Sequence, residues 1–219
     1  MFTDRNDAGR KLAERLAFLK DDSNVIVLGI PRGGIIVAAE IARALAAPLD
    51  IFISHKISAP DNPEFALGAL TSAGEVWLDE AIIEQMHFDR ARIARQIEQT
   101  RGEIARRMKK YRGKRQPLDG RGKTVIVADD GVATGSTMFA ALRALRKQAP
   151  ARLLLAVPVG PPETMKQLAL ECDEVVVLHT PAAFWAVSRF YTAFEQVEDA
   201  QVAHVLEKQK RKRGAECVK

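Results

Sequence analysis

Short apolar runs alternate with amphipathic stretches along most of the chain. Apolar runs predict buried strands, and apolar residues at helical spacing predict helices with one buried face. The strands are expected at residues 25–28, 51–54, 75–78, 125–128, 152–157 and 174–178. The helices are expected at residues 6–20, 35–45, 79–111, 136–148 and 162–170, with Gly102 as a candidate break in the longest one. Residues 56–74 contain Pro60, Pro63 and Gly68 and are predicted to be irregular.

The repeated order of strand and helix predicts an α/β fold with a central, mostly parallel sheet flanked by helices. Ligands of such sheets bind beyond the carboxyl ends of the strands. Asp129 and Asp130 directly follow one predicted strand, and Arg32 and Lys56 follow two others. We therefore expect these four side chains at the ligand-binding edge of the sheet.

The segment after the strand at 125–128 carries the most specific chemistry. Two carboxylates are followed by a turn bounded by glycines, by three hydroxyl side chains and by the start of a helix. Such a turn directs backbone N–H groups and the positive helix end at one point, which suits a phosphate. The carboxylates suit hydroxyls or a cation nearby, because they would repel that phosphate. One anion and several hydroxyls describe a sugar phosphate.

Two common phosphate-binding motifs do not match this turn. A Walker A loop needs four residues between its glycines and a following Lys, whereas Gly131 and Gly135 are one residue closer and no Lys follows. The Gly-x-Gly-x-x-Gly fingerprint of dinucleotide-binding folds is also absent after the strand.

The turn resembles the phosphoribosyl-pyrophosphate (PRPP) signature of the type I phosphoribosyltransferases. The resemblance rests on the run Asp129, Asp130, Gly131, Val132, Ala133, Thr134, Gly135, Ser136 and Thr137, and on the apolar strand before it. It implies that the two acids hold the ribose hydroxyls of PRPP and that the rest of the turn holds its 5′-phosphate.

The family resemblance also implies the reaction. A phosphoribosyl group would pass from PRPP to a nitrogen acceptor, such as a nucleobase or a related compound, with release of diphosphate. Mg²⁺ would be the cofactor, bound mainly by PRPP itself and without a metal site built from protein side chains. Ala133 stands where relatives that act on 6-oxopurines commonly have Asp. This departure weakens hypoxanthine and guanine as acceptors and leaves adenine, orotate-like compounds and others open.

Three further segments match parts of the family site. Pro31, Arg32, Gly33 and Gly34 lie where the family has its diphosphate loop, although a glycine-rich turn is often only a turn. Lys56 and Glu64 lie in the region of a flexible catalytic loop, where Lys56 could pair with diphosphate and Glu64 could handle a proton of the acceptor. A surface loop with a helix-capping Glu is the alternative. Trp185 and Tyr191 are candidates for stacking on the acceptor, with ordinary packing as the alternative.

The resemblance covers nearly the whole chain and implies a poorly characterised, stand-alone branch of the family. That branch shares the opening Phe2-x-Asp4-Arg5-x-x-Ala8-Gly9 and the segment Asn62-Pro63-Glu64. A single domain over residues 1–219 is expected. Its parts would be a small hood from residues 1–20 and 180–205, a long helical insertion at about 79–115 and a basic tail at 206–219.

Composition and charge add a second functional hypothesis. The chain of 219 residues carries a formal charge of +5, and residues 85–123 hold thirteen Lys or Arg against four Asp or Glu. A solvated helix face explains this excess best, and nucleic acid is an unlikely partner because aromatic residues are scarce among the cations. The alternative function is a non-catalytic regulator that binds PRPP, nucleotides or nucleic acid.

The remaining features favour an ordinary cytoplasmic protein. Cys172 and Cys217 are the only cysteines and lie far apart, so neither disulfides nor a zinc site is expected. No apolar run reaches membrane-spanning length, and the N-terminus lacks the apolar region of a signal peptide. A homodimer is compatible with the resemblance, because related enzymes are often dimers.

Overall fold

The computed structural model describes residues 1–113 and 115–216. Its centre is a five-stranded sheet with the strand order β2-β1-β6-β7-β8, in which all neighbours are parallel. The strands are β1 (Val25–Gly29), β2 (Leu49–Ile51), β6 (Thr124–Ala128), β7 (Arg152–Val159) and β8 (Glu174–His179). The predicted α/β class with a mostly parallel sheet is confirmed.

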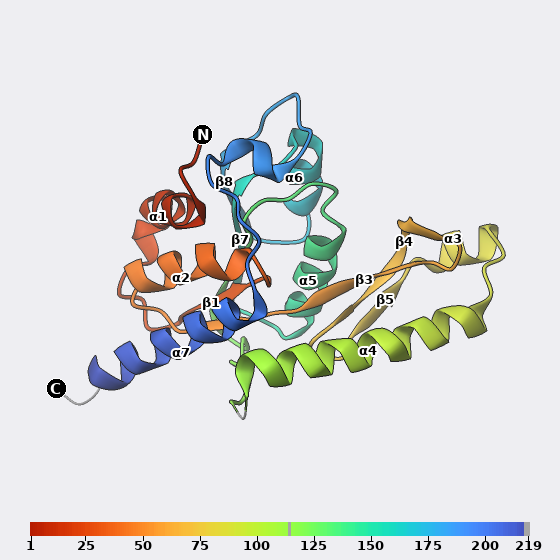
Figure 1. Ribbon diagram of the computed structural model, residues 1–219, viewed down its shortest axis with the longest axis horizontal. Coiled ribbons are helices and arrows are strands. Elements are labelled where there is room, and N and C mark those ends of the chain that lie inside the picture. The colour runs from red at the N-terminus through yellow and green to blue at the C-terminus, as the bar shows by residue number, and fades with distance from the viewer. Residues whose placement is uncertain (114, 217–219) are drawn as a thin grey trace.

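Helices cover both faces of this sheet, which explains why its strands are apolar on both sides (Figure 1). Helices α1 (Arg5–Arg15) and α2 (Gly34–Ala44) pack on one face, against residues such as Val27 and Ile126. Helices α5 (Ser136–Lys147) and α6 (Pro162–Leu168) pack on the other, against residues such as Leu28 and Val127.

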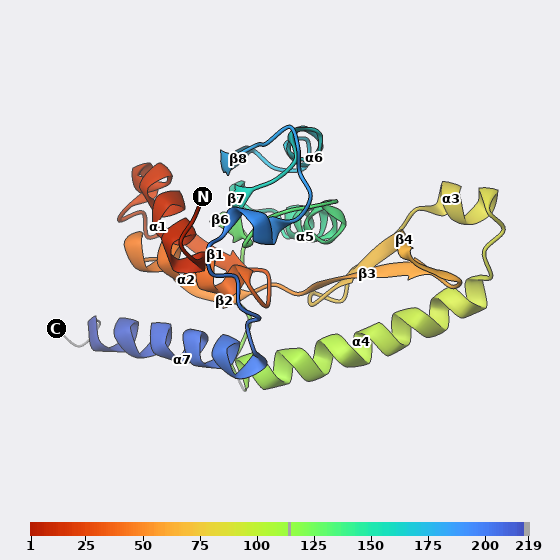
Figure 2. The same ribbon diagram turned by 45° about the horizontal axis from the view of Figure 1, so that its top comes forward.

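A second, antiparallel sheet extends from this body (Figure 2). It consists of β3 (Ser54–Ala59), β4 (Asn62–Thr71) and β5 (Val76–Leu78). Helices α3 (Glu80–Gln85) and α4 (Arg90–Arg112) follow, and α4 runs back along the sheet toward the body. We call residues 54–112 the arm. A hydrophobic cluster joins Ile57 and Leu67 of the hairpin to Ile93 and Ile104 of α4, and it continues into the body through Ile35.

Two predictions are wrong in this part of the chain. Residues 56–74 are not irregular, because β3 and β4 pair as a hairpin and bury Ile57, Leu67 and Leu70 beneath α4. The long helix breaks between α3 and α4 rather than at Gly102. His87 there has a positive φ of 51°, and the Asp89 carboxylate accepts the N–H of Ala91 to start α4.

The N-terminal segment meets the segment that follows β8. Phe2 forms a parallel bridge with Tyr191, beside the short 3₁₀ helix η2 (Val187–Phe190). A second such helix, η1 (Ala17–Leu19), follows α1. The last helix, α7 (Asp199–Glu216), starts beside the end of α4 and includes the described part of the predicted basic tail (Figure 1). Within the described residues, no helix combines the length and apolarity needed to cross a bilayer.

Candidate functional site

The turn after β6 has the shape of a phosphate cradle. Gly131 and Gly135 take positive φ angles of 154° and 81°, which favour glycine, and α5 begins directly afterwards. Within the described part of the chain, the backbone N–H groups of residues 134–137 have no hydrogen-bond acceptor. Such N–H groups at a helix start attract an anion, and the helix dipole adds to the attraction.

Contacts from outside hold the cradle in place. The N–H of Val132 donates to the carbonyl of Val159 at 2.9 Å. The Thr164 hydroxyl donates to the carbonyl of Ala133 at 3.1 Å. The hydroxyls of Thr134 and Ser136 lie 3.4 Å apart on the exposed side of the turn. Contacts within the protein therefore fix the shape of the cradle.

Asp129 and Asp130 lie at the carboxyl end of β6, as predicted. Oδ1 of Asp129 accepts the backbone N–H of Asp130 at 2.8 Å. Burial raises the pKa of Asp129 well above its usual value, and the charge of Asp130 raises it further. The charged form of Asp129 is therefore costly, and a ligand that offers hydroxyls or positive charge would stabilise it.

The glycine-rich loop after β1 contacts these acids directly. The N–H of Ile30 donates to the carbonyl of Ala128 at 2.9 Å, which joins the two loops. A Cβ on Gly34 would lie 2.7 Å from Oδ1 of Asp129, and one on Gly33 would lie 1.8 Å from Oδ2 of Asp130. Only glycine allows this close approach. The predicted diphosphate loop and the acidic turn thus form one site.

Arg32, in the same loop, is exposed. Its positive charge favours the ionised forms of Tyr111 and Asp199, which lie where the end of α4 meets the start of α7. There the Tyr111 hydroxyl donates to Oδ1 of Asp199 at 2.5 Å, and Lys110 Nζ donates to Oδ2 at 2.8 Å. Burial and the bond to Asp199 raise the pKa of Tyr111 to about 12, so its phenol stays protonated at neutral pH.

The sequence analysis assigned no functional role to Arg5, and it named Tyr191 as a candidate for stacking on the acceptor. The structure shows both residues in contact with Asp130. Nε of Arg5 lies 2.6 Å from Oδ2 of Asp130, and the Tyr191 hydroxyl donates to the Asp130 carbonyl at 2.6 Å. The Tyr191 ring is buried against Phe2 and Phe194. Because its ring and hydroxyl are both engaged, Tyr191 is placed to hold the acidic turn rather than to stack on an acceptor. The shared opening around Arg5 was the one signal for that residue.

The other candidates lie on the arm and the hood. Lys56 lies in β3, opposite Ala69 of β4, and so belongs to a strand rather than to an irregular loop. Glu64 belongs to β4, and its side chain lies outside the described residues. Trp185 is 81% exposed, which leaves its indole accessible to a ligand. Their roles in the reaction stay predictions.

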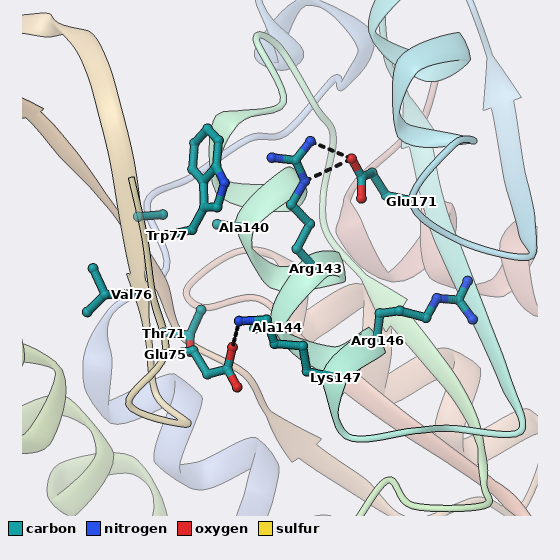
Figure 3. A pocket seen from close by; sticks show the side chains of 11 residues that line it. Thr71, Glu75, Val76, Trp77, Ala140, Arg143, Ala144, Arg146, Lys147 and Glu171 are labelled. Carbon is teal, nitrogen blue, oxygen red and sulfur yellow. Dashed lines mark hydrogen bonds and ion pairs between the residues drawn. The ribbon is translucent and has the colours of Figure 1, made fainter. Parts of the chain in front are cut away.

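A cavity of about 370 Å³ lies between the arm and α5, and no residue of the acidic turn lines it (Figure 3). Trp77 covers Arg143, whose guanidinium carbon lies 4.8 Å from the ring centre. Arg143 also pairs with Glu171 at 2.6 Å, and Lys147 pairs with Glu75 at 2.8 Å. The charges around this cavity therefore largely neutralise one another, and we place the candidate site at the two loops instead.

The described residues contain no group of three or more His, Cys, Asp or Glu side chains that could hold a metal ion. The only carboxylates of the acidic turn are Asp129 and Asp130. This pair suits a magnesium ion that keeps most of its ligands from water and substrate, because Mg²⁺ often takes only one or two protein carboxylates.

A parallel sheet that carries a glycine-rich loop beside an acidic phosphate cradle defines the type I phosphoribosyltransferase class of fold. The comparison with protein families agrees, since the phosphoribosyl transferase domain matches residues 3–192. The chain therefore belongs to the phosphoribosyl transferase domain family.

Two relatives are similar over almost the whole chain. The Mycobacterium tuberculosis protein named "Putative phosphoribosyl transferase Rv0571c" is 39% identical over 208 residues, which cover 95% of this chain. The match covers 47% of that protein, so this chain spans about half the length of the curated relatives it matches. The crystal structure of TT1426 from Thermus thermophilus is 40% identical, with a TM-score of 0.84 over 95% of this chain and 99% of that one.

Proposed function

We propose that the protein is a phosphoribosyltransferase that uses PRPP and Mg²⁺ to transfer a phosphoribosyl group to a nitrogen acceptor, with release of diphosphate. The observation that carries this proposal is the direct contact of the two loops. Gly33 and Gly34 approach Asp129 and Asp130 so closely that no side chain would fit between them. The backbone of the glycine-rich loop, which suits an anion, and the two carboxylates, which suit hydroxyls, are therefore close enough to bind one PRPP molecule.

Each part of PRPP has a matching group in this arrangement. The N–H groups of residues 134–137 would bind the 5′-phosphate, because they point from a helix start and have no acceptor in the described chain. Asp129 and Asp130 would accept hydrogen bonds from the ribose hydroxyls. Backbone groups of the glycine-rich loop would approach the diphosphate, and Arg32 and Lys56 would add positive charge.

The chemistry would depend on position and charge. The bond between the ribose C1 and the diphosphate oxygen breaks, and the diphosphate leaves with the bonding electron pair. A bond between C1 and the acceptor nitrogen forms, and that nitrogen passes its proton to a base, for which Glu64 is the candidate. The sugar becomes positively charged along this path, and the two carboxylates stabilise that charge. Bound magnesium would offset the negative charge of the departing diphosphate. Water must be excluded, and we assign this task to the arm and the hood.

The acceptor is most sharply limited by Ala133, which cannot supply the carboxylate common in relatives that act on 6-oxopurines. We therefore propose adenine, an orotate-like compound or another nitrogen base before hypoxanthine or guanine. Trp185 remains the candidate for stacking on that base, because its indole is exposed.

The direct test is a screen of nucleobases and small amines with PRPP and Mg²⁺, with diphosphate release as the readout. The matched control is the double variant Asp129→Asn, Asp130→Asn, which keeps the shape of both side chains and removes their charge. We expect turnover with at least one acceptor and none in the control. Calorimetry should also show PRPP binding that requires Mg²⁺, and no heat at millimolar PRPP would contradict the proposal.

A regulator without catalysis is the second candidate. It is supported by the solvent side of α4, where Arg95, Arg106 and Lys109 are exposed and have no acidic partner in the described chain. This function would show as a salt-dependent mobility shift with random duplex DNA. The absence of a shift at low salt would exclude the nucleic-acid form of the regulator.

A further inference from the structure

Arg5 reaches from the first residue of α1 into the candidate site. Its Nε lies 2.6 Å from Oδ2 of Asp130, and the two side chains are only 11% and 16% exposed. Its terminal nitrogen donates to the carbonyl of Glu195 at 2.8 Å. The guanidinium carbon lies 3.8 Å from the centre of the Phe194 ring. The guanidinium is therefore fixed by an acid, a carbonyl and an aromatic face at once.

The ion pair lies where three parts of the site meet. A Cβ on Gly33 would lie 1.8 Å from Oδ2 of Asp130 and 2.8 Å from Nε of Arg5. The glycine-rich loop therefore packs on the ion pair itself. On another side, the Tyr191 hydroxyl holds the backbone carbonyl of Asp130 at 2.6 Å. Asp130 is thus held at its side chain by α1 and at its backbone by Tyr191, which follows η2.

We propose that Arg5 is a positioning residue for the PRPP site, which fixes the Asp130 carboxylate through Oδ2 and leaves Oδ1 for a ribose hydroxyl. This inference rests on the proposed function. Its physical reason is that a half-buried carboxylate beside a second one would otherwise turn away from its neighbour or lose its charge. The charge of Arg5 also acts against the raised pKa of Asp129. Arg5 therefore fixes Asp130 by direct contact and lowers the pKa of Asp129 through its charge.

The test compares Arg5→Gln and Arg5→Lys with a control, Arg10→Gln. Arg10 lies on the same helix, is 52% exposed and meets its acid Asp7 only at 3.9 Å. We measure the Kd of PRPP with Mg²⁺ by calorimetry, the thermal midpoint, and KM and kcat for diphosphate release. We expect Arg5→Gln to weaken PRPP binding roughly 10- to 100-fold, with a matching rise in KM, because a charge-assisted bond is lost. Arg5→Lys should recover part of this loss, and Arg10→Gln should bind as the original protein does.

A purely structural role would lower the thermal midpoint and leave the Kd of the folded protein unchanged, and that result would overturn the inference. If Arg5→Gln does not fold, Arg5→Lys decides, because lysine has no Nε at the place that meets Asp130 and lacks the planar fork that also reaches the Glu195 carbonyl. An unchanged Kd in Arg5→Lys would then overturn the inference. If the unaltered protein does not bind PRPP, both the proposed function and this inference are wrong. If the unaltered protein and both Arg5 variants bind PRPP equally well, only this inference is wrong.

Discussion

Asp129 combines its proposed role in PRPP binding with a cost to the stability of the fold. Folding raises the pKa of this carboxyl above its ordinary value of 3.8, so the folded state favours the neutral form. The carboxyl therefore contributes to the free energy of unfolding while it is neutral, and this contribution is complete below pH 3.8. The contribution is lost as the pH rises through the raised pKa of the folded state. At neutral pH, Asp129 is therefore unfavourable for stability. Such a residue beside groups suited to an anion and to hydroxyls is typical of a binding site.

We therefore expect Asp129→Asn to be at least as stable as the original protein at pH 7, although it loses PRPP binding. Its stability advantage should grow as the pH rises from about 4 toward 7, because only the original protein must ionise a carboxyl whose pKa is raised by folding. Denaturant titrations at several pH values measure this difference. A variant that is clearly less stable at pH 7 would contradict the raised pKa.

Gly33 and Gly102 allow a matched comparison of two glycines. A Cβ on Gly33 would overlap the Arg5–Asp130 pair, whereas a Cβ on Gly102 of α4 would meet no atom within 4 Å. We expect Gly33→Ala to cost about 1–3 kcal/mol of unfolding free energy and to abolish PRPP binding. Gly102→Ala should instead add about 0.5–1 kcal/mol, since alanine favours helix. Equal effects in denaturant titrations would refute the close contact at Gly33.

At the scale of elements, α4 is fixed to the body at its C-terminal end. Arg112 and Asp50 pair at 2.9 Å with side chains only 11% and 8% exposed, and Arg112 also donates to the carbonyl of Ile51. The other Asp50 contacts are the N–H groups of Ile51 and Leu118. This buried network joins the arm to β2.

We expect Arg112→Ala to lower the unfolding free energy by about 3–5 kcal/mol, because Asp50 would be left as a buried charge without its partner. The matched control is Arg92→Ala, whose partner Asp61 is 77% exposed. Solvent screens that pair, so the control should leave the denaturation midpoint unchanged. A small effect of Arg112→Ala would mean that water reaches Asp50.

The helices and strands that could be predicted from the sequence are those whose apolar residues follow a single strand or helix spacing. Four strands of the central sheet are short apolar runs, and the structure confirms them with small differences at their ends. The predicted strand at residues 51–54 is displaced, because β2 (Leu49–Ile51) shares only Ile51 with it. The hairpin was missed because Pro60, Pro63 and Gly68 are typical of loops, and only the cover of α4 makes its apolar residues a core. The break between α3 and α4 had a readable signal, since Asp79 and Asp89 each cap a helix start.

The site was predictable to the extent that it is local in the chain. The cradle and the acids lie within one short run, so their position followed from the motif and the strand before it. The partners of Asp130 could not follow, because Arg5 and Tyr191 are 125 and 61 residues away in sequence and come near only when the sheet forms. Such long-range contacts leave no periodic signal.

At the scale of the whole molecule, the arm and α7 both extend from the body and make the chain less compact than its length requires. The accessible surface is 11715 Å², against roughly 10,000 Å² for a compact monomer of this mass. Figures 1 and 2 show the arm standing away from the body in both views.

We expect small-angle X-ray scattering to give a radius of gyration clearly above about 17 Å, the value for a compact chain of 219 residues. Light scattering on the same sample separates an extended monomer from a homodimer by its mass. A monomer at about 17 Å would mean that the arm folds back onto the body in solution.

The positions of the two tryptophans allow movements of the arm and of the hood to be followed by fluorescence. Trp77 lies on β5 against Arg143, and Trp185 lies on the hood segment with 81% of its surface exposed. Replacing either one by phenylalanine leaves a single indole emitter. Fluorescence from Trp185 would then report events over the loops, and fluorescence from Trp77 would report the spacing of arm and α5. Two such proteins, mixed rapidly with the same substrate, could time the two movements independently.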